Sequence, residues 1–149
     1  MRFAIGMVVL LATACAPAPR PMMYGAEACE QCRMTVSEPG FAARALLETG
    51  RAHAFDSVEC LAAWVGEGAA ERLHSLWVQD FGAPERWLRA EEAGYVRGGE
   101  VRSPMGGGIT AHASLDAARA HAAAHGGEVL EWGRVLLGAA AGGGHAHAH

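Results

Sequence analysis

Residues 52–59 read AHAFDSVE, a short predicted strand followed at once by the signals that start a helix. Asp56 and Glu59 have the spacing of a capping box, in which Asp56 accepts a hydrogen bond from the backbone N–H of Glu59 and Glu59 reaches back. Apolar residues then recur at helical spacing as far as Val65, and Gly66 is a typical helix end. The stretch therefore predicts a strand and a helix joined by one short turn.

The segments on either side of this junction predict two more strands. Residues 41–47 form a predicted strand before it, residues 48–51 a turn, and residues 73–81 a strand after it. The resulting order is β-β-α-β.

The same order recurs in the second half of the chain. Its predicted elements are strands at 94–97 and 109–113, a helix at 115–125 that Ser114 can cap, and a strand at 128–132. One such unit is too small to bury enough apolar surface by itself. We therefore expect an α+β fold of two tandem ββαβ units, about residues 29–86 and 87–137, that share one core.

The N-terminus, residues 1–14, has the pattern of a lipoprotein signal peptide. Arg2 precedes an apolar run that ends in small residues before Cys15. The run is far shorter than the roughly 20 apolar residues of a membrane-spanning helix. We expect lipidation of Cys15, a Pro-rich tether over residues 15–28, and an anchor in the cell membrane or outer membrane, facing the periplasm or the cell exterior. An ordinary secretory signal with an incidental Cys15 is the alternative.

A sulfur-rich motif, CEQCRM, follows the tether at residues 29–34. It supplies the thiols of Cys29 and Cys32 and the thioether of Met34. A thiol pair alone indicates redox chemistry or zinc. The added thioether favours Cu(I), because soft sulfur ligands select that ion over hard cations. The alternative for Met34 is an ordinary core position.

Further candidate ligands lie later in the chain. Met105, in the loop SPMGGG at residues 103–108, is a possible distant third sulfur ligand. His112 follows that loop and is the candidate for a fourth or transient ligand. Cys60 is expected to be a small buried residue of the first helix rather than a ligand. An oxidising compartment also makes a disulfide among the cysteines a competitor to metal binding.

Charge and the histidine pattern narrow the function classes. A formal net charge of −4 argues against a nucleic acid partner, and with no nucleotide-binding glycine motif we expect no small-molecule substrate. His121 and His125 are one helical turn apart and could pair on a metal. The pair lacks the acidic neighbour that a zinc hydrolase has.

Residues 138–149 are low in complexity and expected to be disordered. The tail histidines could form an auxiliary site for Cu(II), Zn(II) or Ni(II); they are His145, His147 and His149.

Together these residues resemble the NosL family, the periplasmic lipoprotein copper chaperones that accompany nitrous oxide reductase. The resemblance runs from Cys29 to about Val135. It rests on CEQCRM at 29–34, FDSVEC at 55–60, WVQDF at 77–81, AGYV at 93–96 and PMG at 104–106.

The resemblance implies both a fold and a site. The implied fold is two ββαβ units related to the organomercurial lyase core, and the implied Cu(I) ligands are Cys32, Met34 and Met105. Many relatives lack a cysteine at the position of Cys29, and relatives often have glycine where this chain has Arg33. The resemblance also implies a membrane-anchored chaperone without catalytic activity, which delivers Cu(I) to nitrous oxide reductase through an ABC-type membrane complex.

Two other functions remain open on the sequence alone. A thiol–disulfide oxidoreductase would use Cys29 and Cys32, and it predicts a helix that begins at or just after Cys29 to lower the thiol pKa. A metallochaperone for another copper enzyme would have the same motifs as the leading hypothesis.

Overall fold

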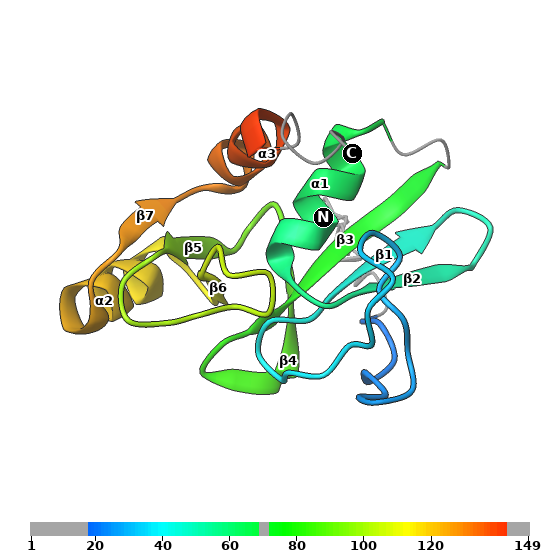
Figure 1. Ribbon diagram of the computed structural model, residues 1–149, viewed down its shortest axis with the longest axis horizontal. Coiled ribbons are helices and arrows are strands. Elements are labelled where there is room, and N and C mark those ends of the chain that lie inside the picture. The colour runs from blue at the N-terminus through cyan, green and yellow to red at the C-terminus, as the bar shows by residue number, and fades with distance from the viewer. Residues whose placement is uncertain (1–17, 69–71, 143–149) are drawn as a thin grey trace, which may run out of the picture.

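The computed structural model describes residues 18–68 and 72–142. The predicted signal peptide, Cys15 and the tail histidines lie outside these ranges. The described elements are β1 (Ala43–Leu47), β2 (Ala52–Phe55), α1 (Val58–Gly66), β3 (Leu73–Asp80), β4 (Ala83–Arg89), β5 (Gly94–Arg97), β6 (Ile109–His112), α2 (Leu115–His125), β7 (Glu128–Leu130) and α3 (Trp132–Gly142) (Figure 1). The fold is α+β, as predicted.

The strands form two antiparallel sheets, and the predicted order β-β-α-β is present twice. The first unit, β1-β2-α1-β3, lies in a four-stranded sheet with the order β2-β1-β3-β4. The second unit, β5-β6-α2-β7, lies in a three-stranded sheet with the order β6-β5-β7. Strand β4 was not predicted, because its side chains are all partly or fully exposed and give no alternation of buried and exposed positions.

The two units share one core, as predicted. The backbone N–H of Phe81, just after β3, donates to the carbonyl of Ala111 on β6 at 2.8 Å and joins the two sheets. A single buried cluster contains Phe55 and Leu61 from the first unit and Tyr95 from the second. Helix α1 contacts β1 and β2 of one sheet and β6 of the other.

The first helix begins one residue later than the capping-box prediction placed it. Ser57 is the N-cap, and its Oγ accepts a hydrogen bond from the backbone N–H of Cys60 at 3.2 Å. The carboxylate of Asp56 accepts instead from the N–H of Ser37 at 3.1 Å. Glu59 therefore does not form the predicted capping box. Its carboxylate instead accepts hydrogen bonds from Ser103 and Ile109. The prediction that Ser114 caps the second helix is confirmed, since its Oγ accepts from Ala117 N–H at 3.1 Å.

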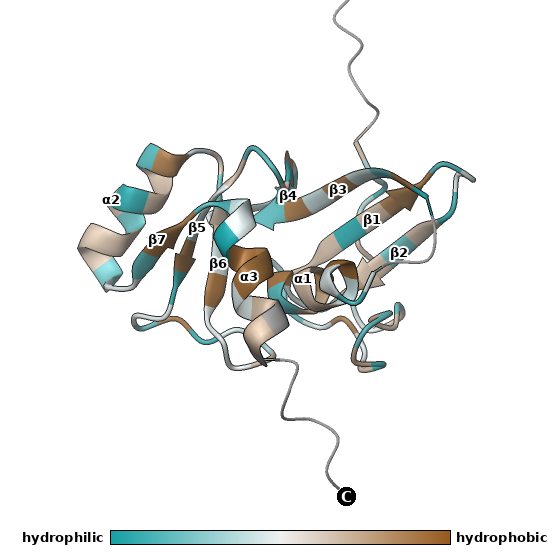
Figure 2. Cartoon of the chain, turned by 90° about the horizontal axis from the view of Figure 1, so that it is seen from above, coloured by the Kyte–Doolittle hydropathy of each residue, from teal (hydrophilic) through white to brown (hydrophobic). Residues whose placement is uncertain are grey.

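The C-terminal end differs from the prediction. Strand β7 ends at Leu130, and α3 begins at Trp132, so residues 138–142 complete a helix rather than start a disordered tail. Trp132 and Val135 are buried one turn apart, and Leu136 packs on the same core, which gives this helix an apolar face. Helix α3 lies beside α1, and α2 lies at the far end of the smaller sheet (Figure 2). None of the described helices has the length and apolarity to cross a membrane.

Candidate metal centre

Three cysteine sulfur atoms converge in the part of the chain that the structure describes. The Sγ atoms of Cys29, Cys32 and Cys60 all lie within 4.8 Å of one another. Cys29 and Cys60 are buried, Cys32 is half-buried, and all three are free thiols. Three sulfur atoms that each bind one ion at about 2.3 Å lie about 4 Å apart. The cluster therefore has nearly the size of a three-coordinate sulfur site.

A short hairpin positions Cys29 and Cys32. The N–H of Cys29 donates to the carbonyl of Met34 at 2.7 Å, and the N–H of Arg33 donates to the carbonyl of Cys29 at 3.0 Å. A further backbone hydrogen bond of 2.8 Å, from Glu30 to Ala54, fixes the hairpin to β2. Arg33 has a φ of 63°, a left-handed conformation that favours glycine. A glycine at this position would adopt the same conformation without a steric cost.

Cys60 comes to the same place from the first turn of α1. Ser57, the N-cap, fixes that turn directly after β2, the strand to which the hairpin is attached. Cys60 is 2% exposed, as expected for a buried residue, but its sulfur faces the other two thiols. Cys60 is therefore a candidate ligand that was not predicted from the sequence. The available signal was its place in the first turn, directly after the strand–helix junction.

The three thiols differ in pKa. The hydrogen bond from the Cys60 thiol, with further hydrogen bonds from the N–H groups of Cys32 and Asp56, lowers the pKa of Cys29 to about 5 despite its burial. Donating that hydrogen bond raises the pKa of Cys60. Burial raises the pKa of Cys32. The metal-free site at neutral pH thus holds one thiolate and two thiols, and a positive ion is drawn to the Cys29 sulfur.

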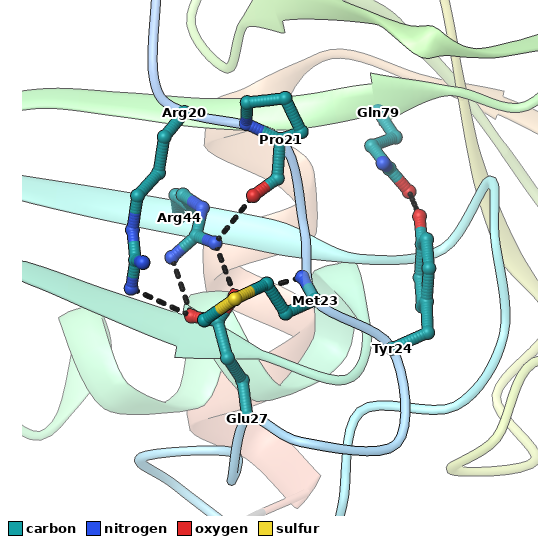
Figure 3. Close-up of polar contacts among 7 residues, drawn as sticks. All are labelled: Arg20, Pro21, Met23, Tyr24, Glu27, Arg44 and Gln79. Carbon is teal, nitrogen blue, oxygen red and sulfur yellow. Dashed lines mark hydrogen bonds and ion pairs between the residues drawn. The ribbon is translucent and has the colours of Figure 1, made fainter.

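A buried ion pair anchors the base of the hairpin. Arg44 is fully buried on β1, and its guanidinium donates to both carboxylate oxygens of Glu27, at 2.6 and 2.9 Å (Figure 3). Burial alone would raise the pKa of Glu27, but the Arg44 hydrogen bonds outweigh it and lower the pKa. Arg44 also donates to the carbonyl of Pro21, and the carbonyl of Glu27 accepts from Val36 N–H at 2.9 Å. The pair therefore holds the segment before Cys29 onto the larger sheet.

The two methionines of the predicted site have exposed side chains. The side chains of Met34 and Met105 are among the most exposed large apolar groups of the described chain, at 57% and 46%. The backbone N–H of Met34 donates to the sulfur of Cys32, so Met34 adjoins the thiol cluster through its backbone. Met105 lies in the loop between β5 and β6.

The carboxylate of Glu59, the residue before Cys60, fixes the Met105 loop. Its Oε1 accepts from Ser103 Oγ at 2.5 Å and from Ile109 N–H at 3.2 Å. A Cβ on Gly107 would lie 2.8 Å from the same oxygen, so a larger residue there would displace the Glu59 carboxylate. The loop that carries Met105 is therefore attached to the first turn of the helix that carries Cys60.

The structure places His112, another predicted ligand, on the face of β6 opposite the thiol cluster. Side chains alternate between the two faces of a strand, and on β6 Ile109 and Ala111 belong to the core cluster that contains Cys29. His112 points the opposite way, toward α2, where its ring lies 4.6 Å from that of His121. We therefore exclude His112 from the sulfur site.

Two ββαβ units with a cluster of thiols beside the first helix define a small α+β protein with a sulfur-rich candidate metal site. The NosL family model matches residues 21–137, and the chain belongs to the NosL family. No curated protein sequence matches the chain significantly.

Two solved structures resemble this one. The crystal structure of the copper chaperone NosL from Shewanella denitrificans is 20% identical, with a TM-score of 0.66 over 78% of this chain and 94% of that one. The solution structure of apo-NosL from Achromobacter cycloclastes is 28% identical, with a TM-score of 0.47 over 61% of this chain and 82% of that one. The first of these supports the fold.

Proposed function

We propose that this protein is a Cu(I) chaperone that binds one ion through Cys29, Cys32 and Cys60. The observation that carries the proposal is the convergence of three sulfur atoms within 4.8 Å. Thiolate and thioether ligands favour Cu(I), and the two candidate thioethers lie on loops attached to this cluster. The structurally similar protein from Shewanella denitrificans is described as a copper chaperone, which agrees with this reading.

The donor set suits Cu(I) better than zinc. A structural zinc site is almost always tetrahedral with four protein ligands. Among the described residues, no fourth cysteine, histidine, aspartate or glutamate donor atom joins the group within 4.8 Å. Soft Cu(I) is satisfied by two or three sulfur ligands. The site is therefore complete for Cu(I) and incomplete for structural zinc.

The different exposures of the ligands give a route for loading and release. Cys32 is half-buried and Met34 is exposed, so an incoming ion meets these sulfur atoms first. Cys29 supplies the negative charge at neutral pH, and Cys60 and Cys32 release their protons as the ion binds. An acceptor can then replace the sulfur ligands one at a time, beginning with the exposed ones. Met105, on the loop fixed by Glu59, is the proposed second thioether of this exchange.

The proposal is tested by competition with a colorimetric Cu(I) chelator under reducing conditions. Cys32→Ser and Cys60→Ser should each weaken Cu(I) binding by at least about tenfold, because a charged sulfur donor is lost. Met34→Ala should weaken it less. His74→Ala, an exposed residue on β3, is the matched control and should bind as wild type. Wild-type affinity in both cysteine variants would contradict the proposal.

The acceptor and the anchor are further parts of the proposal. Membership of the NosL family supports delivery to nitrous oxide reductase through an ABC-type complex, and the sequence around Cys15 supports a lipid anchor facing the periplasm or the cell exterior. Cys15→Ala should release the exported protein from membranes and leave Cu(I) binding unchanged. Exported Cys15→Ala protein that stays in the membrane fraction would refute the anchor.

The oxidoreductase alternative finds less support. It predicted a helix at or just after Cys29, whereas residues 30–32 form a turn and the nearest described helix begins at Val58. The low pKa of Cys29 comes mainly from the Cys60 thiol, which lies outside the CxxC pair. Cys60, rather than Cys32, is thus the main hydrogen-bond partner of the Cys29 thiol. This arrangement favours a metal site over a two-cysteine redox pair.

A further inference from the structure

A second group of donor side chains lies on the other side of the smaller sheet. The rings of His112 and His121 are 4.6 Å apart, and those of His121 and His125 are 4.7 Å apart. These three residues, here called the histidine cluster, run from a buried ring on β6 to an exposed ring at the end of α2. The cluster contributes nothing to the sulfur site, because α2 is at the far end of the smaller sheet from α1 (Figures 1 and 2).

The backbone brings a carboxylate to the outer end of this cluster. The N–H of Glu100 donates to the carbonyl of His125 at 3.2 Å, and Glu100 Oε2 lies 3.5 Å from His125 Nδ1. The close approach needs glycine beside it, since a Cβ on Gly99 would lie 2.6 Å from the same carbonyl. The loop after β5 is therefore held against the C-terminal end of α2, with Glu100 in contact with His125.

At the inner end of the histidine cluster, neighbouring side chains contact the rings of His112 and His121. His112 Nε2 lies 2.9 Å from Thr110 Oγ1, which engages one nitrogen of that ring. The ring of Phe81 meets His121 edge-on at 5.5 Å and closes one side. His121 is half-buried between these groups, so its ring is held on the face of α2 that it shares with His125.

We propose that His121 and His125, with Glu100, form a second metal site for a divalent transition-metal ion such as Zn(II). Histidines four residues apart on a helix lie on one face with Cβ atoms about 5–6 Å apart, close enough for both rings to bind one ion. Neutral imidazole and carboxylate ligands suit borderline divalent ions rather than Cu(I). The two sites of this chain would thus differ in the ion they select.

Metal binding at this site requires a local rearrangement. The rings of His121 and His125 are tilted at 37° to each other, and the donor atoms of His121, His125 and Glu100 do not all lie within 4.8 Å of one another in this structure. Rotation of His125, whose side chain is 48% exposed, can bring them together.

The test follows histidine ring nitrogens by NMR during titration with Zn(II). The protein is full-length, with His145, His147 and His149 replaced by alanine so that the tail cannot compete. Since each ring is observed separately, zinc bound to the cysteines does not obscure the result. We expect the His121 and His125 rings to shift together with one midpoint, and the ring of His74 to stay unchanged.

Variants test whether His121 and His125 bind the same metal ion. His125→Ala, at an exposed helical position where alanine is favourable, should weaken the response of His121 by at least about tenfold. Glu100→Gln, which removes the charge and keeps the shape, should weaken it less. His74→Ala is the matched control and should change nothing. Separate midpoints for His121 and His125, or an unchanged His121 response in His125→Ala or in a second variant, His125→Gln, would overturn the proposal.

Discussion

The Ser103 hydroxyl donates a hydrogen bond of 2.5 Å to Glu59 Oε1, and so joins the loop of Met105 to the helical turn of Cys60. Glu59→Ala removes this attachment without touching a proposed ligand. If Met105 takes part in Cu(I) binding, Glu59→Ala should accelerate loss of Cu(I) to a chelator about as much as Met105→Ala does.

The combination of the two variants separates a shared effect from two independent ones. Glu59→Ala with Met105→Ala should be no worse than Met105→Ala alone, because coupled residues are not additive. Glu85→Ala, an exposed carboxylate on β4, is the control. Fully additive losses would show that Glu59 acts on something other than Met105.

The hydrogen bond between Cys60 and Cys29 gives a prediction about pH. Cys29 should titrate near its pKa of about 5, well below the ordinary 9.0, and thiolate absorbance in the ultraviolet measures this directly. Cys60→Ala should move the titration upward, because the principal hydrogen-bond donor is gone. An unchanged midpoint in Cys60→Ala would contradict the assigned cause.

The same shift has a consequence for stability. Between about pH 5 and pH 9 the unfolded protein binds a proton at Cys29 that the folded protein does not, so this residue makes the metal-free fold more stable as pH rises. The contribution is lost as pH falls through the folded pKa. Urea unfolding of wild type and Cys29→Ser across this range should show the steeper rise in wild type, most clearly above about pH 7, where the histidines of lowered pKa no longer bind a proton in either state.

Arg33 offers a test of backbone strain. A left-handed conformation costs a residue other than glycine about 1–2 kcal/mol, whereas glycine loses about 0.5–1 kcal/mol more backbone entropy on folding. Arg33→Gly should therefore raise the free energy of unfolding by up to about 1 kcal/mol, measured in urea. Arg102→Gly, at an exposed position without a left-handed backbone, is the comparison, and there the entropy loss should dominate. A stability loss in Arg33→Gly as large as that in Arg102→Gly would argue against strain at this position.

The Arg44–Glu27 pair should be far more important than a surface pair. Glu27→Gln leaves the guanidinium of a fully buried arginine without its ionic partner, and breaking a buried pair in this way costs about 3–5 kcal/mol. Glu48→Gln, which disrupts the exposed pair with Arg72, should cost less than about 1 kcal/mol. Because the pKa of Glu27 is lowered, its contribution is present at neutral pH and lost as pH falls through that lowered value. Similar costs for the two variants would contradict a structural role for the buried pair.

The sequence was sufficient for the elements whose signals are local. The β-β-α-β order follows from turn residues, helix caps and apolar spacing, and it is present in both units. Strand β4 was missed because its exposure does not alternate, and α3 was missed because the apolar positions of Trp132 and Val135 precede a low-complexity stretch. The N-cap shifted from Asp56 to Ser57 because Asp56 bonds a distant backbone N–H instead.

The residues of the candidate site were likewise predictable only where local sequence brings them together. Cys29 and Cys32 lie in one short motif, so their proximity could be predicted from sequence. Cys60 joins them through the packing of α1 beside the hairpin, and its place in the first turn after the strand–helix junction was the one local signal for it. His112 was assigned by closeness in sequence to the Met105 loop, but strand alternation turns its ring toward α2.

X-ray absorption of the Cu(I)-loaded protein tests the central claim most directly. The full-length protein is used in reduced form, with the three tail histidines replaced by alanine. We predict a first shell of sulfur atoms only, and the loss of one sulfur neighbour in Cys60→Ser. A first shell containing nitrogen or oxygen, or an identical spectrum in Cys60→Ser, would contradict a Cu(I) site built on Cys29, Cys32 and Cys60.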